Sequence, residues 1–209
     1  MTQSKPEIPC KQCPCYHWPT VFEPRFSNHH KKPTRRKTLD LLLIGEAPGT
    51  EEIIMQSPFV GPAGRLLQLF LKTAKLDFLL IGITNACRCS KGSAVEFKPP
   101  QEAFDLCTFN LIQEIKAYRP KNIIALGAFA INALVVAEPE FFKQASQISS
   151  KLAVTKLDWN RFVISKSQTT KRKLQIIPTV HPSYILRQGS CDLQTIIESR
   201  WSTLSTILI

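Results

Sequence analysis

Residues 40–49 read DLLLIGEAPG, and this stretch decides how the rest of the chain is interpreted. The run 41–44 is apolar without a break and ends at Gly45, which is typical of a β-strand buried on both faces of a sheet. Such strands occur mainly in parallel sheets that helices cover on both sides. Three further runs, 79–84, 122–126 and 174–180, have the same character and predict three more strands.

Helical patterns lie between the predicted strands. Apolar residues recur at helical spacing over 63–74 and 102–118, and shorter helices are predicted over 128–136, 141–149 and 192–208. A small hairpin is expected within 151–165. Strands that alternate with helices predict an α/β fold: three α/β/α layers with a central, mainly parallel four-stranded sheet. We expect one domain over residues 1–209, with 1–38 as a polar N-terminal segment that includes a basic loop at 29–37.

The charge balance is strongly basic. Lys and Arg total 27 against 16 Asp and Glu, a net charge of +11. This excess favours a polyanionic partner such as nucleic acid, because binding releases the counterions condensed on phosphates. The plainer interpretation is that the charge keeps the protein in solution.

No apolar run approaches the roughly 18 residues of a membrane span, and the N-terminus lacks the apolar core of a signal peptide. We therefore expect a cytoplasmic protein that does not enter a membrane.

Unusual residues cluster where three of the predicted strands end, and ligands of parallel sheets bind at this edge. Four of the eight glycines lie within 45–64, a loop that also carries carboxylates and Phe59. Asn85 follows the second strand, as a turn former or as an amide that reads a base edge. His181 follows the fourth strand, as a structural residue or as a catalyst. The coincidence of the three segments predicts a ligand pocket.

The seven cysteines suggest a metal or cluster site, because a chain without a secretion signal is unlikely to use them as disulfides. Cys10 and Cys13 form a C-x-x-C pair, and Cys89 and Cys107 stand alone further on. Four cysteines suit either an iron–sulfur cluster or structural zinc. Cys107 could also be a small buried hydrophobic residue. The remaining cysteines, Cys15, Cys87 and Cys191, are interpreted as spares, although Cys15 and Cys87 are close enough in sequence to the predicted ligands to compete with them.

Several of these motifs resemble one known family. The chain is similar to the family 4 uracil-DNA glycosylases, the iron–sulfur members of the uracil-DNA glycosylase superfamily. The resemblance runs in order from residue 10 to about residue 194 and leaves out only loops. The residues that carry it are GEAPG at 45–49, PFVG at 58–61 with Ala63-Gly64 and Leu66-Leu67, Thr84-Asn85, Leu126-Gly127 and HPS at 181–183.

The resemblance implies a role for each residue of the predicted pocket. A glycosylase flips the nucleotide out of the duplex and holds the base in a fitted pocket. Phe59 would stack on the flipped uracil, and Asn85 would pair with its N3–H and O4. Glu52 would lie against C5 and exclude the methyl group of thymine. His181 would donate to the uracil O2, where negative charge develops as the bond breaks.

Activation of the attacking water would fall to a residue of the loop after the first strand. A related family has an aspartate at the position of Ala47, so Ala47 is expected to line the pocket without a carboxylate. Glu46 is the nearest candidate, through its side chain or through a water held by the neighbouring backbone. A dissociative mechanism tolerates a weak base, because stabilising the leaving group supplies most of the rate.

The resemblance also implies how DNA and the cluster are held. Ile185 or Leu186 would be a wedge between bases and Arg187 a phosphate contact, although both aliphatic residues could equally be core. Cys10, Cys13, Cys89 and Cys107 would bind a [4Fe–4S] cluster, with zinc as the alternative. The cluster would be structural, and it would place basic residues such as Arg88, Lys91 and Lys98 near DNA.

We therefore expect a monofunctional enzyme of DNA repair, active as a monomer on DNA that contains uracil. It would hydrolyse the N-glycosidic bond of deoxyuridine, release uracil and leave an abasic site for base excision repair. The alternative is a non-catalytic iron–sulfur protein that binds nucleic acid and has kept the fold.

Overall fold

The computed structural model describes residues 10–27, 38–90, 99–137, 163–166 and 173–189, together with Thr195, Trp201, Leu204 and Leu208. Its strands are β1 (Arg25–Phe26), β2 (Leu41–Gly45), β3 (Ile81–Asn85), β4 (Asn122–Leu126), β5 (Val163–Lys166) and β6 (Lys173–Thr179). Its helices are α2 (Thr50–Met55), α3 (Pro62–Thr73), α4 (Gln101–Tyr118), α5 (Ala128–Ala137) and α7 (Pro182–Gln188). None of the described helices has the length and apolar character needed to span a membrane.

The strands form one sheet in the order β1-β3-β2-β4-β6-β5. The four predicted strands are its parallel centre, β3-β2-β4-β6, which confirms the mainly parallel α/β architecture. The predicted number of four strands was too low, because β1 pairs antiparallel with β3 and β5 pairs antiparallel with β6. β1 was missed because two residues are too short for a periodic pattern. β5 begins within the predicted hairpin region, and residues 151–162 lie outside the described part.

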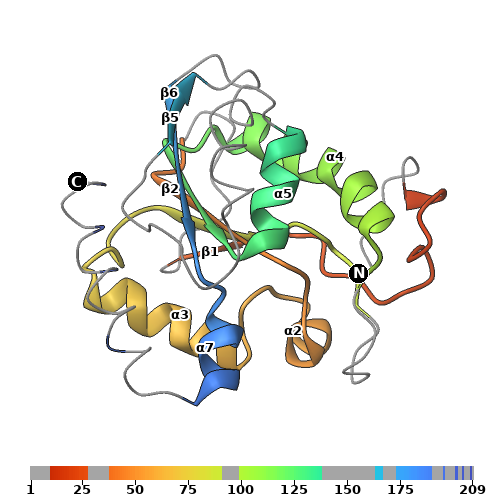
Figure 1. The fold of residues 1–209 in the computed structure, drawn as a ribbon, viewed down its shortest axis with the longest axis horizontal. Helices are drawn as coiled ribbons and strands as arrows, with labels where there is room; N and C mark the ends of the chain where they lie inside the picture. The colour runs from red at the N-terminus through yellow and green to blue at the C-terminus, as the bar shows by residue number, and fades with distance from the viewer. Residues whose placement is uncertain are drawn as a thin grey trace.

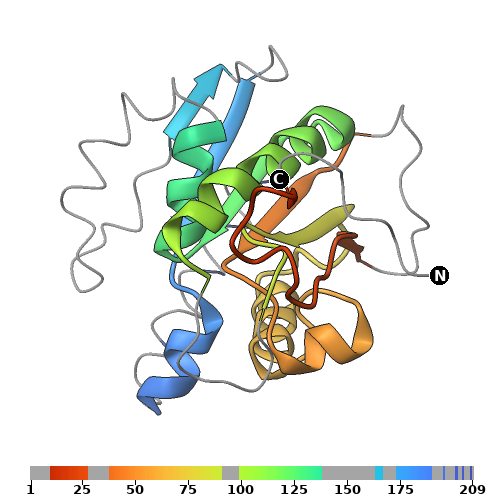
Figure 2. The same ribbon diagram turned by 90° about the vertical axis from the view of Figure 1, so that its right-hand side faces the viewer.

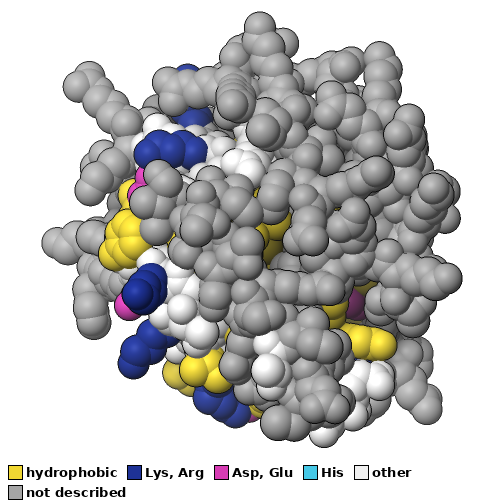
Figure 3. All heavy atoms as spheres, turned by 60° about the vertical axis from the view of Figure 1, so that its left-hand side comes forward, with side chains coloured by type: hydrophobic (Ala, Val, Ile, Leu, Met, Phe, Trp, Pro, Cys, Tyr) yellow, Lys and Arg dark blue, Asp and Glu magenta, His cyan; other side chains and the backbone are white. Residues whose placement is uncertain are grey.

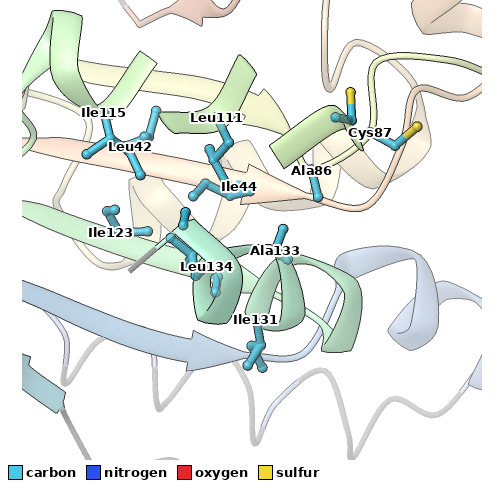
Figure 4. Close-up of a cluster of buried hydrophobic side chains, with 14 of the residues drawn as sticks. Leu42, Ile44, Ala86, Cys87, Leu111, Ile115, Ile123, Ile131, Ala133 and Leu134 are labelled. Carbon is cyan, nitrogen blue, oxygen red and sulfur yellow. The ribbon is translucent and has the colours of Figure 1, made fainter. Parts of the chain in front are cut away.

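The central strands are buried on both faces, as the unbroken apolar run predicted. Along β2, Leu42 and Ile44 pack on one side of the sheet, and Leu41 and Leu43 pack on the other. The first side is covered by α4 and α5, whose packing against β2 is visible in Figure 4. The second side is covered by α3 and by the residues around α7. Figures 1 and 2 show these helix pairs on opposite faces, so the sheet is the middle of three layers.

Three of the predicted helices agree with α3, α4 and α5 within one or two residues. The predicted helix 141–149 lies outside the described residues. Of the predicted helix 192–208 only four residues are described; all four are helical, and Trp201 stacks on Phe70 in the core with ring centroids 5.6 Å apart. Two short helices, α2 and α7, were not predicted. Both follow strands at the carboxyl edge of the sheet, where they border the cavity described next.

Candidate functional site

A cavity of about 580 Å³ opens at the carboxyl edge of the parallel strands. This volume is within the range of small-ligand sites. The loop after β2, the end of β3 and the start of α7 all contribute to its walls. The sequence-predicted residues that line it are Glu46, Ala47, Glu52, Phe59, Asn85, His181, Leu186 and Arg187. The three strand-end segments therefore meet around one space.

Phe59 lines this cavity in an unusual backbone conformation. Its φ of 56° lies in the left-handed region that side chains with a Cβ seldom adopt. Two glycines make room for it: a Cβ on Gly64 would collide with the carbonyl group of Phe59, and a Cβ on Gly45 would collide with the Phe59 ring. The clustered glycines thus allow a strained loop to hold an aromatic ring against the strand ends.

Asn85 ends β3 and is almost fully buried, with 3% of its surface exposed. Its side-chain Oδ1 has no hydrogen-bond partner among the described residues. Buried polar atoms are usually paired, so an unpaired acceptor that lines a cavity suits a ligand that brings its own donor. The backbone beyond Asn85 is well held, because Ala86 N–H donates to Gly45 O and Cys87 N–H donates to Glu46 O, both at 2.9 Å.

Glu52 lines the cavity, but its carboxylate also ties the loop together. Gly49 N–H donates to Oε2 at 3.1 Å, and Gly61 N–H donates to Oε1 at 2.7 Å. The first contact caps the start of α2 and the second reaches the start of α3. Both oxygens therefore bind backbone donors, a structural role that the resemblance to the glycosylases did not imply. No sequence signal links Glu52 to a backbone amide nine residues away.

His181 caps α7 and is held in one orientation. Its Nδ1 accepts the backbone N–H of Ser183 at 3.2 Å and lies 2.7 Å from Ser183 Oγ. Arg187 Nη1 donates to the same hydroxyl at 3.1 Å. A backbone N–H can only donate, so Nδ1 is an acceptor and the ring proton is on Nε2. Gly127, with φ of 85°, lets the backbone after β4 pass close to His181, since a Cβ there would lie 3.1 Å from His181 Cβ.

The helix α7 separates the two candidate wedge residues. Ile185 is 3% exposed and packs in the core, whereas its neighbour Leu186 is 46% exposed and lines the cavity. The structure therefore argues against Ile185 as a wedge, because its side chain packs in the core and does not line the cavity. Leu186 and Arg187 remain on the accessible side.

Five cysteines line a second, separate cavity. The four predicted ligands Cys10, Cys13, Cys89 and Cys107 all line it, and Cys87 lines it as well. Cys15 lies next to them, fully buried, and its N–H donates to Cys13 Sγ at 3.4 Å. The other lining side chains are mostly apolar, among them Tyr16, Phe22 and Leu106. Cys87 was interpreted as a spare, and sequence spacing alone could not show that its side chain faces the same cavity as Cys89.

The thiols of this cavity differ in their electrostatic surroundings. A hydrogen bond from the Cys87 thiol lowers the pKa of Cys107 to about 6, against the effect of burial and with help from Arg88. Burial raises the pKa of Cys15 to about 12. The lowered pKa favours the thiolate form of Cys107, the form that binds metals. Within the described residues, no three His, Cys, Asp or Glu side chains converge at the spacing of a single metal ion.

Arg88 does not face solvent, contrary to the prediction that it contributes to a DNA-binding surface. Only 2% of it is exposed, and its Nη2 lies 2.7 Å from Glu114 Oε2. Burial lowers the pKa of Arg88, but Glu114 and Cys107 more than offset this, so that the pKa is raised and the guanidinium stays charged. Lys91 and Lys98 lie outside the described residues. On the face shown in Figure 3, the described Lys and Arg side chains lie in several groups along the left side.

Comparison with known proteins connects this arrangement to one family. The model of the uracil DNA glycosylase superfamily matches residues 33–205. A type-4 uracil-DNA glycosylase of Thermotoga maritima is 30% identical over 158 residues, which is 75% of this chain and 71% of that protein. Type-4 uracil-DNA glycosylases of Archaeoglobus fulgidus and Sulfurisphaera tokodaii are each 25% identical, over 85% and 97% of this chain and 78% and 81% of their own lengths.

Proposed function

The chain belongs to the uracil-DNA glycosylase superfamily, and we propose that it excises uracil from DNA by hydrolysing the N-glycosidic bond of deoxyuridine. The observation that carries this proposal is the convergence of Phe59, Asn85 and His181, from three distant parts of the sequence, on one cavity at the strand ends. The product would be an abasic site in otherwise intact DNA, the starting point of base excision repair. We propose that the enzyme works as a monomer.

Recognition of the base would rest on Phe59 and Asn85. An aromatic ring offers a stacking surface to any flipped base, so Phe59 would supply affinity without much selectivity. Asn85 would supply the selectivity, with Oδ1 accepting from uracil N3–H and the amide nitrogen donating to O4. Cytosine presents an acceptor at N3 and a donor at N4, so both contacts with a fixed amide would be lost. The unpaired, buried Oδ1 supports this assignment.

Bond cleavage would rest on His181. As the bond to the sugar breaks, negative charge grows on uracil O2, and a preorganised donor there lowers the barrier. An imidazole that accepts at Nδ1 presents Nε2–H as the donor. Glu46, on the cavity wall, would position the attacking water through its side chain or its neighbouring backbone. Ala47 would border the same space, and Glu52 would limit the room at C5 while it holds the loop.

Contacts with the DNA itself would come from α7. Leu186, exposed at the mouth of the cavity, is suited to fill the space left by a flipped base. Arg187 carries spare guanidinium donors beyond the one on Ser183 and would bind a phosphate.

We also propose that Cys10, Cys13, Cys89 and Cys107 hold a [4Fe–4S] cluster. A cavity lined by thiols and apolar side chains suits such a cluster, whose ligands are thiolates. The cluster would crosslink the N-terminal segment, the loop after β3 and α4, and its role would be structural. Because this requires reduced cysteines, a reducing compartment such as the cytoplasm suits the protein.

The test is incubation of the purified protein with a duplex that contains a single uracil, followed by alkali to break the strand at abasic sites. We expect one cleavage product from the uracil strand and none from a matched thymine strand. Asn85→Ala and His181→Ala serve as controls. Product no greater than in these controls, with DNA binding intact, would overturn the proposal in favour of a non-catalytic nucleic-acid-binding protein.

A further inference from the structure

A buried charge pair lies between the cysteine cavity and the strand that carries Asn85. Arg88 Nη2 is 2.7 Å from Glu114 Oε2, and both side chains are largely removed from solvent. The hydroxyl of Thr84, the residue before Asn85, joins the pair: it accepts from Arg88 Nη1 and lies 3.3 Å from Glu114 Oε1. Burying two charges costs solvation free energy that their attraction barely repays, so stability alone does not account for the pair.

One helix holds the residues after β3 at two points. Cys107 and Glu114 are seven residues apart on α4, two turns along the same face. Cys107 Sγ accepts the backbone N–H of Arg88 at 3.3 Å, while Glu114 binds the Arg88 side chain. Both the main chain and the side chain of Arg88 are therefore fixed to α4.

The opposite side of this segment is fixed to the loop after β2. Ala86 N–H donates to Gly45 O and Cys87 N–H donates to Glu46 O. Asn85 thus lies between Thr84, which the charge pair holds, and Ala86, which the pocket loop holds. Its own Oδ1 has no hydrogen-bond partner among the described residues, so no bond to that oxygen fixes the amide.

We infer that Arg88, Glu114 and Thr84 are positioning residues that fix the Asn85 amide and thereby set the selectivity of the pocket for uracil. The inference rests on the proposed function, since it assigns the Asn85 amide to the base edge. It gives the cysteine cavity a connection to recognition through Arg88, which contacts Cys107 with its backbone and Thr84 with its side chain. None of the three residues needs to touch the base.

The experiment measures selective binding rather than activity. Duplexes that carry 2′-fluoro-deoxyuridine or 2′-fluoro-deoxycytidine at one site resist cleavage, because fluorine destabilises positive charge on the sugar. The ratio of their dissociation constants reports how well the base edge is read. Thr84→Val keeps the shape of the side chain and removes its hydroxyl. The double variant Arg88→Met/Glu114→Met removes the charges while it keeps apolar bulk.

We expect Thr84→Val and the double variant each to reduce the preference for uracil about tenfold, because small misplacements of a binding group have effects of this order. Iron content should stay near that of the wild type in both variants. The melting temperature should stay near that of the wild type in the double variant and fall in Thr84→Val, which leaves Arg88 and Glu114 each without one hydrogen-bond partner. In an Asn85→Ala background, Thr84→Val should cause no further loss, because residues that act through one group are not additive. Lys121→Met, which breaks an ion pair of the same 2.7 Å length at the opposite end of the sheet, should leave the preference unchanged.

A preference that survives both Thr84→Val and the double variant would overturn the inference. Equal losses from Thr84→Val in the wild-type and Asn85→Ala backgrounds would overturn it as well, since the effect would then not pass through Asn85. A parallel alkali assay on the wild type separates this result from the proposed function. A wild type that prefers the uracil analogue but releases no uracil would contradict the catalysis and leave the inference standing.

Discussion

The ring of Phe59 lies beside the imidazole of His181, with centroids 5.7 Å apart and planes inclined by 37°. Phe59 comes from a strained loop after β2, and His181 comes from the start of α7. The proposed stacking group and the proposed donor are therefore held against each other before any base arrives. Such preorganisation lowers the cost of binding, because neither group has to be ordered by the ligand.

Phe59→Leu should weaken base binding by about 1–3 kcal/mol, the usual contribution of one stacked base, which corresponds to roughly a 5- to 150-fold loss in affinity. The substitution also removes core contacts, so the melting temperature should fall. Phe70→Leu is the matched control, because Phe70 is buried in the same core cluster and does not line the cavity. Equal losses of affinity in the two variants would show that stacking by Phe59 is not the cause.

Asn85→Ala should lower excision at least about 100-fold, as expected when one preorganised polar contact is lost. Its melting temperature should not fall, because the change removes an unpaired buried oxygen that costs about 1–3 kcal/mol. Asn122→Ala is the contrasting control, since Asn122 Nδ2 donates to Asp40 O at 3.0 Å. That variant should lose stability and keep full excision, as read by thermal melting and the alkali assay. A destabilised Asn85→Ala enzyme with normal excision would contradict both expectations.

The parallel core of the fold could be predicted because its signal is local. Each central strand is an unbroken apolar run, and α3 and α4 repeat apolar residues at helical spacing. β1 has only two residues and depends on pairing with β3, so no local sequence pattern predicts this strand. The sequence of α7 also carries a helix signal, because Pro182 at its first position and Gly189 just after its end are the usual start and stop residues of a helix.

The pocket residues could be predicted from their places at strand ends, but their partners could not. The partners of the Glu52 carboxylate are backbone amides. Every residue except proline has such an amide, so no residue type in the sequence points to these hydrogen bonds. The burial of Arg88 depends on Glu114, which lies on another element, and a basic residue in a loop otherwise suggests exposure. The distinction between Ile185 and Leu186 needed the helix orientation of α7, which was not anticipated.

Glu52→Gln should destabilise the fold by about 1 kcal/mol, because the amide group keeps one acceptor and turns a donor towards a backbone N–H. The free energy of unfolding in urea measures this loss. Glu51→Gln is the matched control on the same helix turn, since it breaks only an exposed ion pair with Arg65 at 3.4 Å, which contributes less than about 0.5 kcal/mol. Equal stability of the two variants would show that the two hydrogen bonds of the Glu52 carboxylate contribute little to the free energy of unfolding.

Ser183→Ala should slow the cleavage step about tenfold with little change in DNA affinity, because His181 loses the hydroxyl that helps to orient its ring. Single-turnover excision at saturating enzyme isolates that step. The ring ¹⁵N resonances of His181 report its tautomer and should show protonated Nε2 in the wild type. Gln188→Ala, an exposed change on the same helix, should leave the rate unaltered. A rate for Ser183→Ala equal to that of the wild type would show that the hydroxyl does not position His181.

Replacing Cys10, Cys13, Cys89 or Cys107 by Ser should each abolish iron binding and the visible absorption of the purified protein, because each thiolate would bind one iron of a [4Fe–4S] cluster. Cys15→Ala should keep iron, since Cys15 is fully buried beside the cysteine cavity and does not line it. Removal of iron should speed hydrogen exchange in residues 10–27. This segment is joined to the loop after β3 by a few backbone hydrogen bonds, such as Val21 N–H to Arg88 O and Ser90 N–H to Pro19 O.

A colourless purified protein that contains one zinc per chain would show that the cysteines bind structural zinc and not an iron–sulfur cluster. Iron that persists after loss of Cys89 but not of Cys87 would move the ligand assignment to Cys87, which lines the same cavity.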